Sequence, residues 1–409
     1  MLSYTDAAQA VLEQAQEASL AKRDQETVPL LTSLGRVLAE PIAADRDQPP
    51  FPRSTRDGFA CRTADLGNGS PLKIIGQLRA GEIWRDQPLA PGQTIEIMTG
   101  APVPEGADCI VMIEHVLTRE RAIFPSLDRT WSPGENIVPR ASEAQSGTIL
   151  VPSGTLLGPQ QIAAAAACGY STLPVYLKPR VAILATGDEL VPITETPQAH
   201  QIRNSNSYSI AAQVLRTGGE PILLPITPDR LPETKQAIRK GLECDLLILS
   251  GGVSMGQYDF VEQALSNLQA AFFFTGARIQ PGKPVVFGKV PVSDGHKYFF
   301  GLPGNPISTM VTFALFAAPM LRALAGQPPE NWNPVFHDAQ LKSPITVKSG
   351  LTRFLPANME SHIKGATVTP RAWQGSGDLA SVAGANCFVV VPEETPTLES
   401  GSRVSILMP

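Results

Sequence analysis

A short apolar run that ends in a glycine loop constrains the fold of this chain more than any other feature. Residues 245–260 have the sequence DLLILSGGVSMGQYDF. The run from Leu246 to Leu249 is bounded by polar residues and glycine, as in a parallel-sheet strand that is covered on both faces. Glycines after such a run allow positive φ and a close approach of the backbone to a ligand. The stretch therefore predicts a strand of an open α/β sheet, in which ligands bind at the carboxyl ends of the strands.

The loop after this strand is a candidate anion site. Successive free N–H groups in such a turn can cradle an anion. A lone Gly-Gly pair would also suit an ordinary strand-to-helix turn, but three more glycine-rich or acidic strand ends lie in the same half of the chain. We therefore predict ligand contacts in two loops, at Ser250, Gly251, Gly252, Ser254 and Gly256 in the first and at Pro303, Gly304 and Asn305 in the second.

Residues 179–326 alternate between short apolar strands and helices with one apolar face, which predicts a doubly wound parallel sheet. In this region Asn305 is the expected N-cap of the last helix, and Pro306 takes its first position. Strands are expected at 181–185, 222–224, 245–249, 272–274 and 285–288, and helices at 207–215, 232–240, 259–268 and 306–324.

Charged residues follow several of these strands. They are the acidic residues Asp188, Glu189, Asp229 and Asp259, and Lys283 after a Pro-Gly turn. Carboxylates suit a hard cation such as Mg²⁺, and glycine loops with a lysine suit phosphate. The pattern therefore predicts a phosphorylated ligand bridged by a metal ion. The chain lacks GxxxxGK[ST], a GxGxxG after the first strand and Gly-x-Ser-x-Gly, which disfavours a P-loop, a dinucleotide site and a hydrolase elbow.

Outside this region the sequence predicts a capped first helix, a short amphipathic helix, a β-rich domain, a small-residue helix and a barrel-like C-terminal β domain. The expected helices cover residues 3–20, 31–38 and 158–169, and the expected strands 72–75, 94–97, 109–113, 388–391 and 404–407.

Composition disfavours several classes of protein. The 409 residues carry a formal net charge of −5, so there is no basic surface to attract nucleic acid in bulk. The longest apolar stretch, near residues 310–324, contains Thr312, Pro319 and Arg322 and is too short to predict a membrane span. Five scattered cysteines without a CxxC pair, and a first segment without the features of a signal peptide, favour a cytoplasmic location.

Eight short segments carry a resemblance to a known family. They are PPFPRSTRDGFA (49–60), MTGAPVPEGAD (98–108), GENI (134–137), ATGDEL (185–190), SGGVSMGQYDF (250–260), PGKP (281–284), GLPGNPIS (301–308) and QGSG (374–377). In this order and spacing the chain resembles MoeA-type molybdopterin molybdenumtransferases, whose relatives include the E domain of gephyrin. Each segment is weak by itself, but the combination is specific and extends over nearly the whole chain.

The resemblance implies an elongated homodimer of four-domain subunits. A central linking domain would comprise residues 26–43 and 143–176, with a β-rich domain, 44–142, inserted between them. The α/β molybdopterin-binding domain would comprise 1–25 and 177–327, and the C-terminal β domain 328–409. The active cleft would lie between the α/β domain of one subunit and the β-rich domain of the other.

The resemblance also implies an activity. The family inserts molybdenum from molybdate into adenylylated molybdopterin with Mg²⁺, and releases AMP and molybdenum cofactor. A separate adenylyltransferase and the apoproteins of molybdoenzymes would be further partners. By position, the resemblance assigns catalytic roles to Asp57, Thr99, Asp188, Glu189 and Asp259, metal binding to Asp188, Glu189, Asp229 and Asp259, and ligand binding to Lys283.

Two residues depart from the family pattern. Gln280 stands where many members have lysine, so an anion-binding charge is missing or supplied by Arg278. Arg56 stands before Asp57 where methionine is usual, which adds a cation beside the expected cleft. Two alternatives stay open: an adenylyltransferase, because related α/β domains activate molybdopterin with ATP, and a scaffold. A scaffold would not need the acidic residues at the strand ends.

Overall fold

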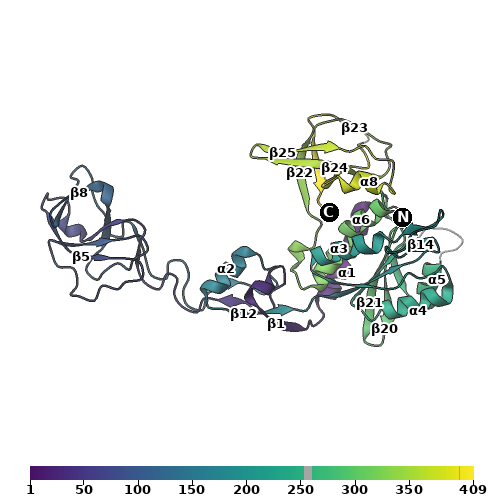
Figure 1. The fold of residues 1–409 in the computed structure, drawn as a ribbon, viewed down its shortest axis with the longest axis horizontal. Coiled ribbons are helices and arrows are strands. Elements are labelled where there is room, and N and C mark those ends of the chain that lie inside the picture. Colours follow the sequence, from purple (N-terminus) through teal and green to yellow (C-terminus); the bar gives the residue numbers. More distant parts are fainter. Residues whose placement is uncertain (253–259, 396) are drawn as a thin grey trace.

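The computed structural model describes residues 1–252, 260–395 and 397–409. The chain is elongated, with a β-rich region at one end, a slender linking region in the middle, and an α/β region together with a small barrel at the other end (Figure 1). The linking region is a pair of antiparallel strands, β1 (Gln25–Pro29) and β12 (Thr172–Tyr176), with helix α2 (Pro159–Ala167). This pairing joins the segments that precede and follow the β-rich region.

The main sheet of the α/β region has six strands in the order β16, β13, β17, β21, β20, β18. Their bounds are Glu220–Leu223, Arg180–Ala185, Leu246–Ser250, Gly295–Leu302, Val286–Val292 and Ala271–Phe274. The first four are parallel, but β20 pairs antiparallel with both β21 and β18. The prediction of a parallel sheet is therefore wrong for one strand, β20, which runs opposite to the other five. Only Ser293 and Asp294 separate β20 from β21, which is too few residues for the crossover that a parallel pair needs.

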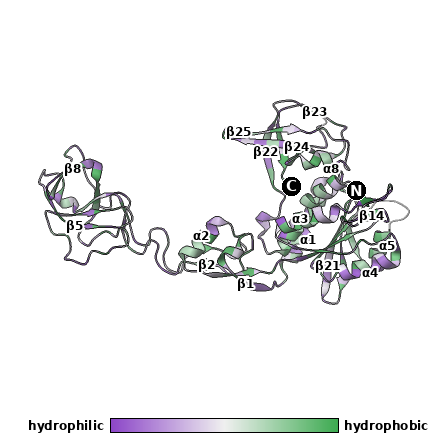
Figure 2. Cartoon of the chain, viewed as in Figure 1, coloured by the Kyte–Doolittle hydropathy of each residue, from purple (hydrophilic) through white to green (hydrophobic). Residues whose placement is uncertain are grey.

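Helices cover both faces of this sheet, as the doubly wound prediction requires. Alternate residues of β13 and β17 enter two separate cores: Val181 and Ile183 in one, Ala182 and Leu184 in the other. The helices on the first face are α1 (Tyr4–Ser19), α3 (Asn206–Thr217), α6 (Pro306–Thr312) and α7 (Ala318–Leu324), and those on the second are α4 (Leu231–Gly241) and α5 (Phe260–Asn267). The mixed colouring of α4 reflects its amphipathic sequence (Figure 2).

The helix that runs through α6 and α7 is a core element. A π-helical segment, Phe313–Ala317, joins the two helices. Among the described residues, the helix Pro306–Leu324 is the one candidate for crossing a membrane by length and hydropathy, but 83% of that window is buried inside the protein. Its apolar composition is therefore explained by packing against the sheet and the helices around it.

The β-rich region contains a six-stranded sheet in the order β7, β4, β6, β5, β9, β8. Its strands are β4 (Gly58–Cys61), β5 (Leu72–Leu78), β6 (Gln93–Ile97), β7 (Cys109–Met112), β8 (Val116–Arg119) and β9 (Ala122–Pro125), with 3₁₀ turns at Thr63–Asp65 and Ile113–His115. Short pairs flank it: β2 (Ile42–Ala43) with β11 (Ile149–Val151), and β3 (Arg53–Ser54) with β10 (Ile137–Val138).

One predicted helix is absent. The segment near residues 31–38 forms a 3₁₀ turn, Leu30–Ser33, and then extends to bridge Val37 to Leu156 and Leu38 to Val175. Gly35 has φ +74°, which favours a turn over a continuing helix. Backbone pairing with distant segments therefore overrides the local helical pattern.

The C-terminal region closes into a barrel, as predicted. The pairings run β24, β25, β22, β28, β26 and back to β24. These strands are β22 (Phe336–Leu341), β24 (Thr352–His362), β25 (Gly365–Pro370), β26 (Cys387–Val391) and β28 (Arg403–Leu407), and helix α8 (Leu379–Ala383) precedes β26. The remaining short elements are β14 (Leu190–Val191), β15 (Ile202–Arg203), β19 (Ile279–Gln280), β23 (Ile345–Thr346), β27 (Thr397–Leu398) and a 3₁₀ turn at Pro329–Asn331. Strand β19 pairs with β24 and so joins the barrel to the α/β region.

Candidate functional site

The carboxyl ends of β13, β17 and β21 form the centre of the candidate site. Parallel register places Ala185 beside Ser250 and Ser250 beside Leu302, so the loops after these strands meet at one edge of the sheet. A Cβ atom added to Gly251 would lie 2.7 Å from the carbonyl oxygen of Thr186. Gly251 and Gly252 also have φ of +89° and +63°. Glycine therefore suits these positions, because a residue with a side chain could adopt this backbone conformation and this close contact only with strain.

The structure brings together most of the residues predicted for these two loops. Ser250, Gly251 and Gly252 follow β17, and Pro303, Gly304 and Asn305 follow β21. Ser254, Gly256 and Asp259 lie outside the described residues. A Cβ on Gly304 would be 3.7 Å from Cα of Gly251, so the two loops touch.

Asn206, which the sequence analysis did not select, joins these loops. It is the first residue of α3, and its Nδ2 donates to Ser250 Oγ at 3.1 Å and to the Gly304 carbonyl oxygen at 2.7 Å. Because a carbonyl oxygen can only accept, these bonds determine which end of the amide faces the loops. Its Oδ1 atom is buried, as is Oγ1 of Thr186, and neither has a hydrogen-bond partner among the described residues. Buried polar atoms normally have hydrogen-bond partners, so these two atoms suit hydrogen bonds to a ligand.

We expect Asn206→Ala to weaken ligand binding roughly tenfold, because it leaves the Ser250 hydroxyl and the Gly304 carbonyl without their donor, at a cost of about 1–3 kcal/mol. The measurement is calorimetric titration with AMP as the probe. Asn204→Ala is the matched control, since the Asn204 side chain bonds to Ser207 within the start of α3. That control should lower the thermal midpoint and leave the affinity unchanged. Equal losses of affinity in both variants would show that Asn206 acts only through the stability of α3.

Three of the predicted metal-binding carboxylates gather beside this edge. Asp188 and Glu189 follow β13, Asp229 follows β16, and the Asp229 backbone N–H donates to Asp188 Oδ1 at 3.3 Å. Burial raises the pKa of Asp229, and the charges of Asp188 and Glu189 raise that pKa further. Within the described residues, however, no group of three or more His, Cys, Asp or Glu side chains is arranged to hold a metal ion. The three carboxylates therefore do not constitute a metal site by themselves, and the fourth predicted ligand, Asp259, is among the residues not described.

We expect Asp188→Asn to raise the thermal midpoint at pH 7 by about 1–2 °C, because it removes a charge that repels Asp229. The gain should shrink as the pH falls. The folded-state pKa of Asp229 is raised, so in the folded protein Asp229 becomes protonated at a pH at which it is still ionised in the unfolded chain. Once Asp229 is neutral, Asp188 no longer repels it in the wild type either. Calorimetry between pH 4 and pH 8 tests this. A gain in thermal midpoint that is independent of pH would show that reduced repulsion of Asp229 is not its cause.

A groove of about 280 Å³ separates the sheet edge from the C-terminal barrel. Lys283 lines it with Gln280, Pro303 and Asn305 on the α/β side, and Trp373 and Ser376 line it on the barrel side. Lys283 is the only lysine or arginine among these described lining residues. Arg278, which the sequence analysis offered as a substitute cation for Gln280, instead makes an ion pair with Glu393 at 3.4 Å.

Two contacts explain the shape of this groove. Asn305 occupies the N-cap position of α6 but makes no capping bond with its side chain. Its Nδ2 donates instead to Ser376 Oγ at 2.8 Å, and Ile307 N donates to the Ser376 carbonyl oxygen at 3.0 Å. The QGSG loop of the barrel is thereby held against the second ligand loop. A Cβ on Gly282 would collide with the Thr312 side chain, so the backbone beside Lys283 packs closely on α6.

Asp57 and Thr99 form a separate pair in the β-rich region. Thr99 donates to Asp57 Oδ1 from its backbone N at 2.7 Å and from its hydroxyl at 2.8 Å. These two bonds lower the pKa of Asp57, so its carboxylate is ionised at neutral pH. The pair is exposed, and within one chain its region lies at the opposite end of the molecule from the α/β sheet (Figure 1). The structure thus brings these two residues to each other and not to the sheet edge.

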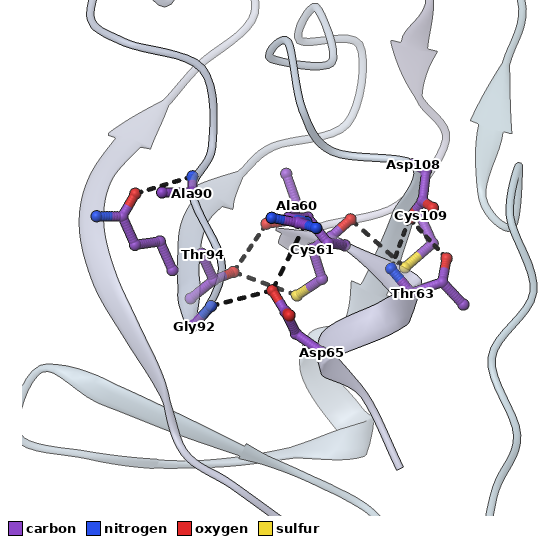
Figure 3. A network of polar contacts seen from close by, with 11 residues as sticks. Ala60, Cys61, Thr63, Asp65, Ala90, Gly92, Thr94, Asp108 and Cys109 are labelled. Carbon is purple, nitrogen blue, oxygen red and sulfur yellow. Dashed lines mark hydrogen bonds and ion pairs between the residues drawn. The ribbon is translucent and has the colours of Figure 1, made fainter. Parts of the chain in front are cut away.

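The polar network in Figure 3 is structural. Asp108 Oδ1 accepts from the backbone N and the hydroxyl of Thr63, both at 2.6 Å. Cys61 and Cys109 lie opposite each other on β4 and β7, yet both are buried free thiols. Burial raises the pKa of Cys61 to about 12 and that of Cys109 to about 11. Neither is therefore a thiolate nucleophile at neutral pH.

Comparison with protein families gives three consecutive matches along the chain. Residues 2–169 match the MoeA N-terminal region (domain I and II), residues 182–323 match a probable molybdopterin binding domain, and residues 338–408 match the MoeA C-terminal region (domain IV).

Individual relatives agree over almost the full length. A molybdopterin molybdenumtransferase of a Nostoc species is 35% identical and is aligned over 94% of this chain and 89% of its own. The protein of the same name from Bacillus subtilis is 34% identical over 94% of this chain and 90% of its own. The crystal structure of a molybdopterin biosynthesis moeA protein from Pyrococcus horikoshii superposes with a TM-score of 0.82 at 29% identity, and each chain is covered completely.

Proposed function

Because the chain belongs to the MoeA family of molybdopterin molybdenumtransferases, we propose that the sheet edge and the groove beside it bind molybdopterin in its adenylylated form. The enzyme transfers molybdenum into molybdopterin in the biosynthesis of molybdenum cofactor. Molybdate is the proposed metal source, and AMP is the proposed leaving product. Family membership over the whole chain is the observation that carries this function.

The described residues have suitable chemistry for such a substrate. Lys283 lines the groove as a point charge for a phosphate oxygen. The loop at Gly251 and Gly252 has the positive φ that occurs in anion-binding turns, although the Gly251 N–H itself donates to the Leu302 carbonyl oxygen at 3.3 Å. Asn206 holds Ser250 and Gly304 in place, and its Oδ1, which has no partner among the described residues, is available as an acceptor. These groups bind and orient the substrate.

A divalent cation is part of the proposal. Asp188, Glu189, Asp229 and Asp259 are the oxygen donors that a hard ion such as Mg²⁺ prefers. Burial, and then the charges of Asp188 and Glu189, raise the pKa of Asp229, and a nearby cation would stabilise its ionised form. When bound, Mg²⁺ would offset the negative charge of the substrate pyrophosphate. Because the described carboxylates do not form a set of metal ligands, the ion would depend on additional oxygen ligands, from Asp259 or from the substrate.

We further propose that the active site is shared between two subunits of a homodimer. Asp57 and Thr99 match functional positions of the family but lie far from the sheet edge of their own chain (Figure 1). A second subunit could place its β-rich region over that edge. The ionised Asp57 carboxylate would then face the site formed by the other subunit.

The decisive experiment follows AMP release from adenylylated molybdopterin in the presence of Mg²⁺. We expect AMP release that depends on molybdate and is accompanied by an equal amount of molybdenum cofactor. Consumption of ATP in the absence of molybdate would instead identify an adenylyltransferase. Substrate binding without turnover under either condition would favour a scaffold. Both of these outcomes contradict the proposal.

A further inference from the structure

A second and larger cavity lies at the other end of the helices that border the candidate site. It has a volume of about 620 Å³, which is within the range of small-molecule sites. We call it the inter-domain pocket. The linking region contributes Gly35 and Leu156, the last turn of α3 contributes Arg216, and the barrel contributes His337. The site described above is at the first residue of α3, and this helix has 12 residues and is therefore about 17 Å long. The two sites are distinct.

The charged side chains that line the inter-domain pocket are the two cations Arg216 and Arg322. His337 and Pro409, the last residue of the sequence, also line it, and the described lining includes no Asp or Glu side chain. Within the described residues neither arginine makes an ion pair. Arg322 is half-buried, its Nη1 donates to the carbonyl oxygens of Trp332 at 2.9 Å and Asn333 at 2.7 Å, and burial lowers its pKa. Both arginines lie in the last turn of a helix, a position that favours a cation; Arg216 is exposed, and Arg322 is partly buried.

An unpaired acceptor also lines the inter-domain pocket. Gln213 donates from Nε2 to the Ser209 carbonyl oxygen at 3.4 Å, whereas its Oε1 is buried and has no hydrogen-bond partner among the described residues. A buried acceptor without a donor is costly, so this atom suits a ligand with an N–H or O–H group.

Another part of the lining is apolar. Phe313 and Ala314 come from the π-helical segment, and Val335 and Met408 come from the barrel side. Single π-helical turns within α-helices occur frequently at functional sites. The pocket therefore combines an apolar surface with two arginines and one free acceptor.

We propose that the inter-domain pocket binds a small organic anion, with its charged group at Arg216 and Arg322, a donor toward Gln213 Oε1 and an apolar body against Phe313 and Val335. This ligand is additional to molybdopterin and molybdate. Because the pocket is lined by the linking region, the α/β region and the barrel, an occupant would hold the three together.

The test uses 1-anilinonaphthalene-8-sulfonate, a fluorescent probe that has a sulfonate, an N–H group and aromatic rings. The full chain, in its native oligomeric state, is titrated. We expect saturable binding of one probe per chain. Arg216→Gln should weaken binding about tenfold, the effect of losing one charge-assisted hydrogen bond, and Val335→Trp should also weaken binding, because the larger ring takes up space that the probe would occupy. Arg216→Gln should leave AMP release unchanged.

Two control variants match these in chemistry. Arg85→Gln removes an exposed arginine of the β-rich region, and Ile363→Trp adds a large ring at a fully exposed position of the barrel. Both should bind the probe as the wild type does, and Lys283→Ala should also leave its affinity unchanged. The uncharged analogue N-phenyl-1-naphthylamine should bind more weakly.

Three results would overturn the proposal. Unchanged affinity in Arg216→Gln and Val335→Trp would place the probe elsewhere on the surface. Loss of affinity in Lys283→Ala would place it in the substrate groove. Equal affinity for the uncharged analogue would show that the arginines contribute nothing. None of these depends on which reaction the sheet edge catalyses.

Discussion

Mixing equal amounts of inactive Asp57→Ala and inactive Asp188→Ala protein should restore about a quarter of the wild-type activity. Random exchange between two homodimers yields about one half of the dimers as mixed pairs, and each mixed pair has one intact site out of two. The expectation follows from the position of Asp57 in the β-rich region, far along the molecule from the sheet edge that carries Asp188 (Figure 1). The measurement is molybdate-dependent AMP release after subunit exchange, with exchange confirmed by native mass spectrometry of differently tagged subunits.

The matched control mixes two variants from the same side of the proposed site. A mixture of Asp188→Ala and Asp229→Ala, which change two neighbouring residues of one chain, should not restore activity. Each of the two sites in a mixed dimer would then carry one defect. If exchange is complete and the Asp57→Ala and Asp188→Ala mixture stays inactive, the active site is contained within one chain or is not shared in this way.

Lys283→Ala should weaken the binding of adenylylated molybdopterin roughly ten- to a hundredfold. The loss of one charge-assisted hydrogen bond costs about 1.5–3 kcal/mol, and about 1.4 kcal/mol corresponds to a factor of ten. Lys283 is the only lysine or arginine among the described residues of the groove, so no neighbouring cation replaces it. The affinity of the wild type should also fall with added salt more steeply than that of the variant.

Lys297→Ala is the control for this experiment. Lys297 makes an ion pair with Asp245 at 3.4 Å near the start of β17, whereas the ligand loops follow the other end of that strand. This variant should bind the substrate within about twofold of the wild type, since an exposed ion pair contributes about 0–1 kcal/mol and the ligand does not touch it. Similar losses in both lysine variants would mean that the protein's overall charge, and not a contact in the groove, attracts the substrate.

Local sequence patterns were sufficient for much of the α/β region. The apolar run at Leu246 and the glycines after it predicted a buried strand with a loop that approaches its neighbours closely, and both are present. The same is true of the strand that ends before Asp188. These features are predictable because burial on both faces and positive φ each restrict the residue types that fit.

The incorrect predictions share one cause. The helix predicted near residues 31–38 does not form, because Val37 pairs with Leu156 and Leu38 pairs with Val175. The direction of β20 depended on its two-residue connection to β21. Periodicity describes which face of an element is apolar, but it does not indicate which distant segment provides the hydrogen bonds.

The sequence by itself determined the strand ends, the two ligand loops, the acidic residues and the family. The tertiary structure alone decided which of these meet. Asn206 bonds to Ser250 and Gly304 because α3 begins beside two strand ends that are 44 and 98 residues away. The Asn305 side chain bonds to Ser376 of the barrel, 71 residues away, and does not cap its own helix. Asp57 is held by Thr99 at the far end of the molecule. Each of these contacts depends on how the regions pack, and packing between distant segments leaves no periodic signal in the sequence.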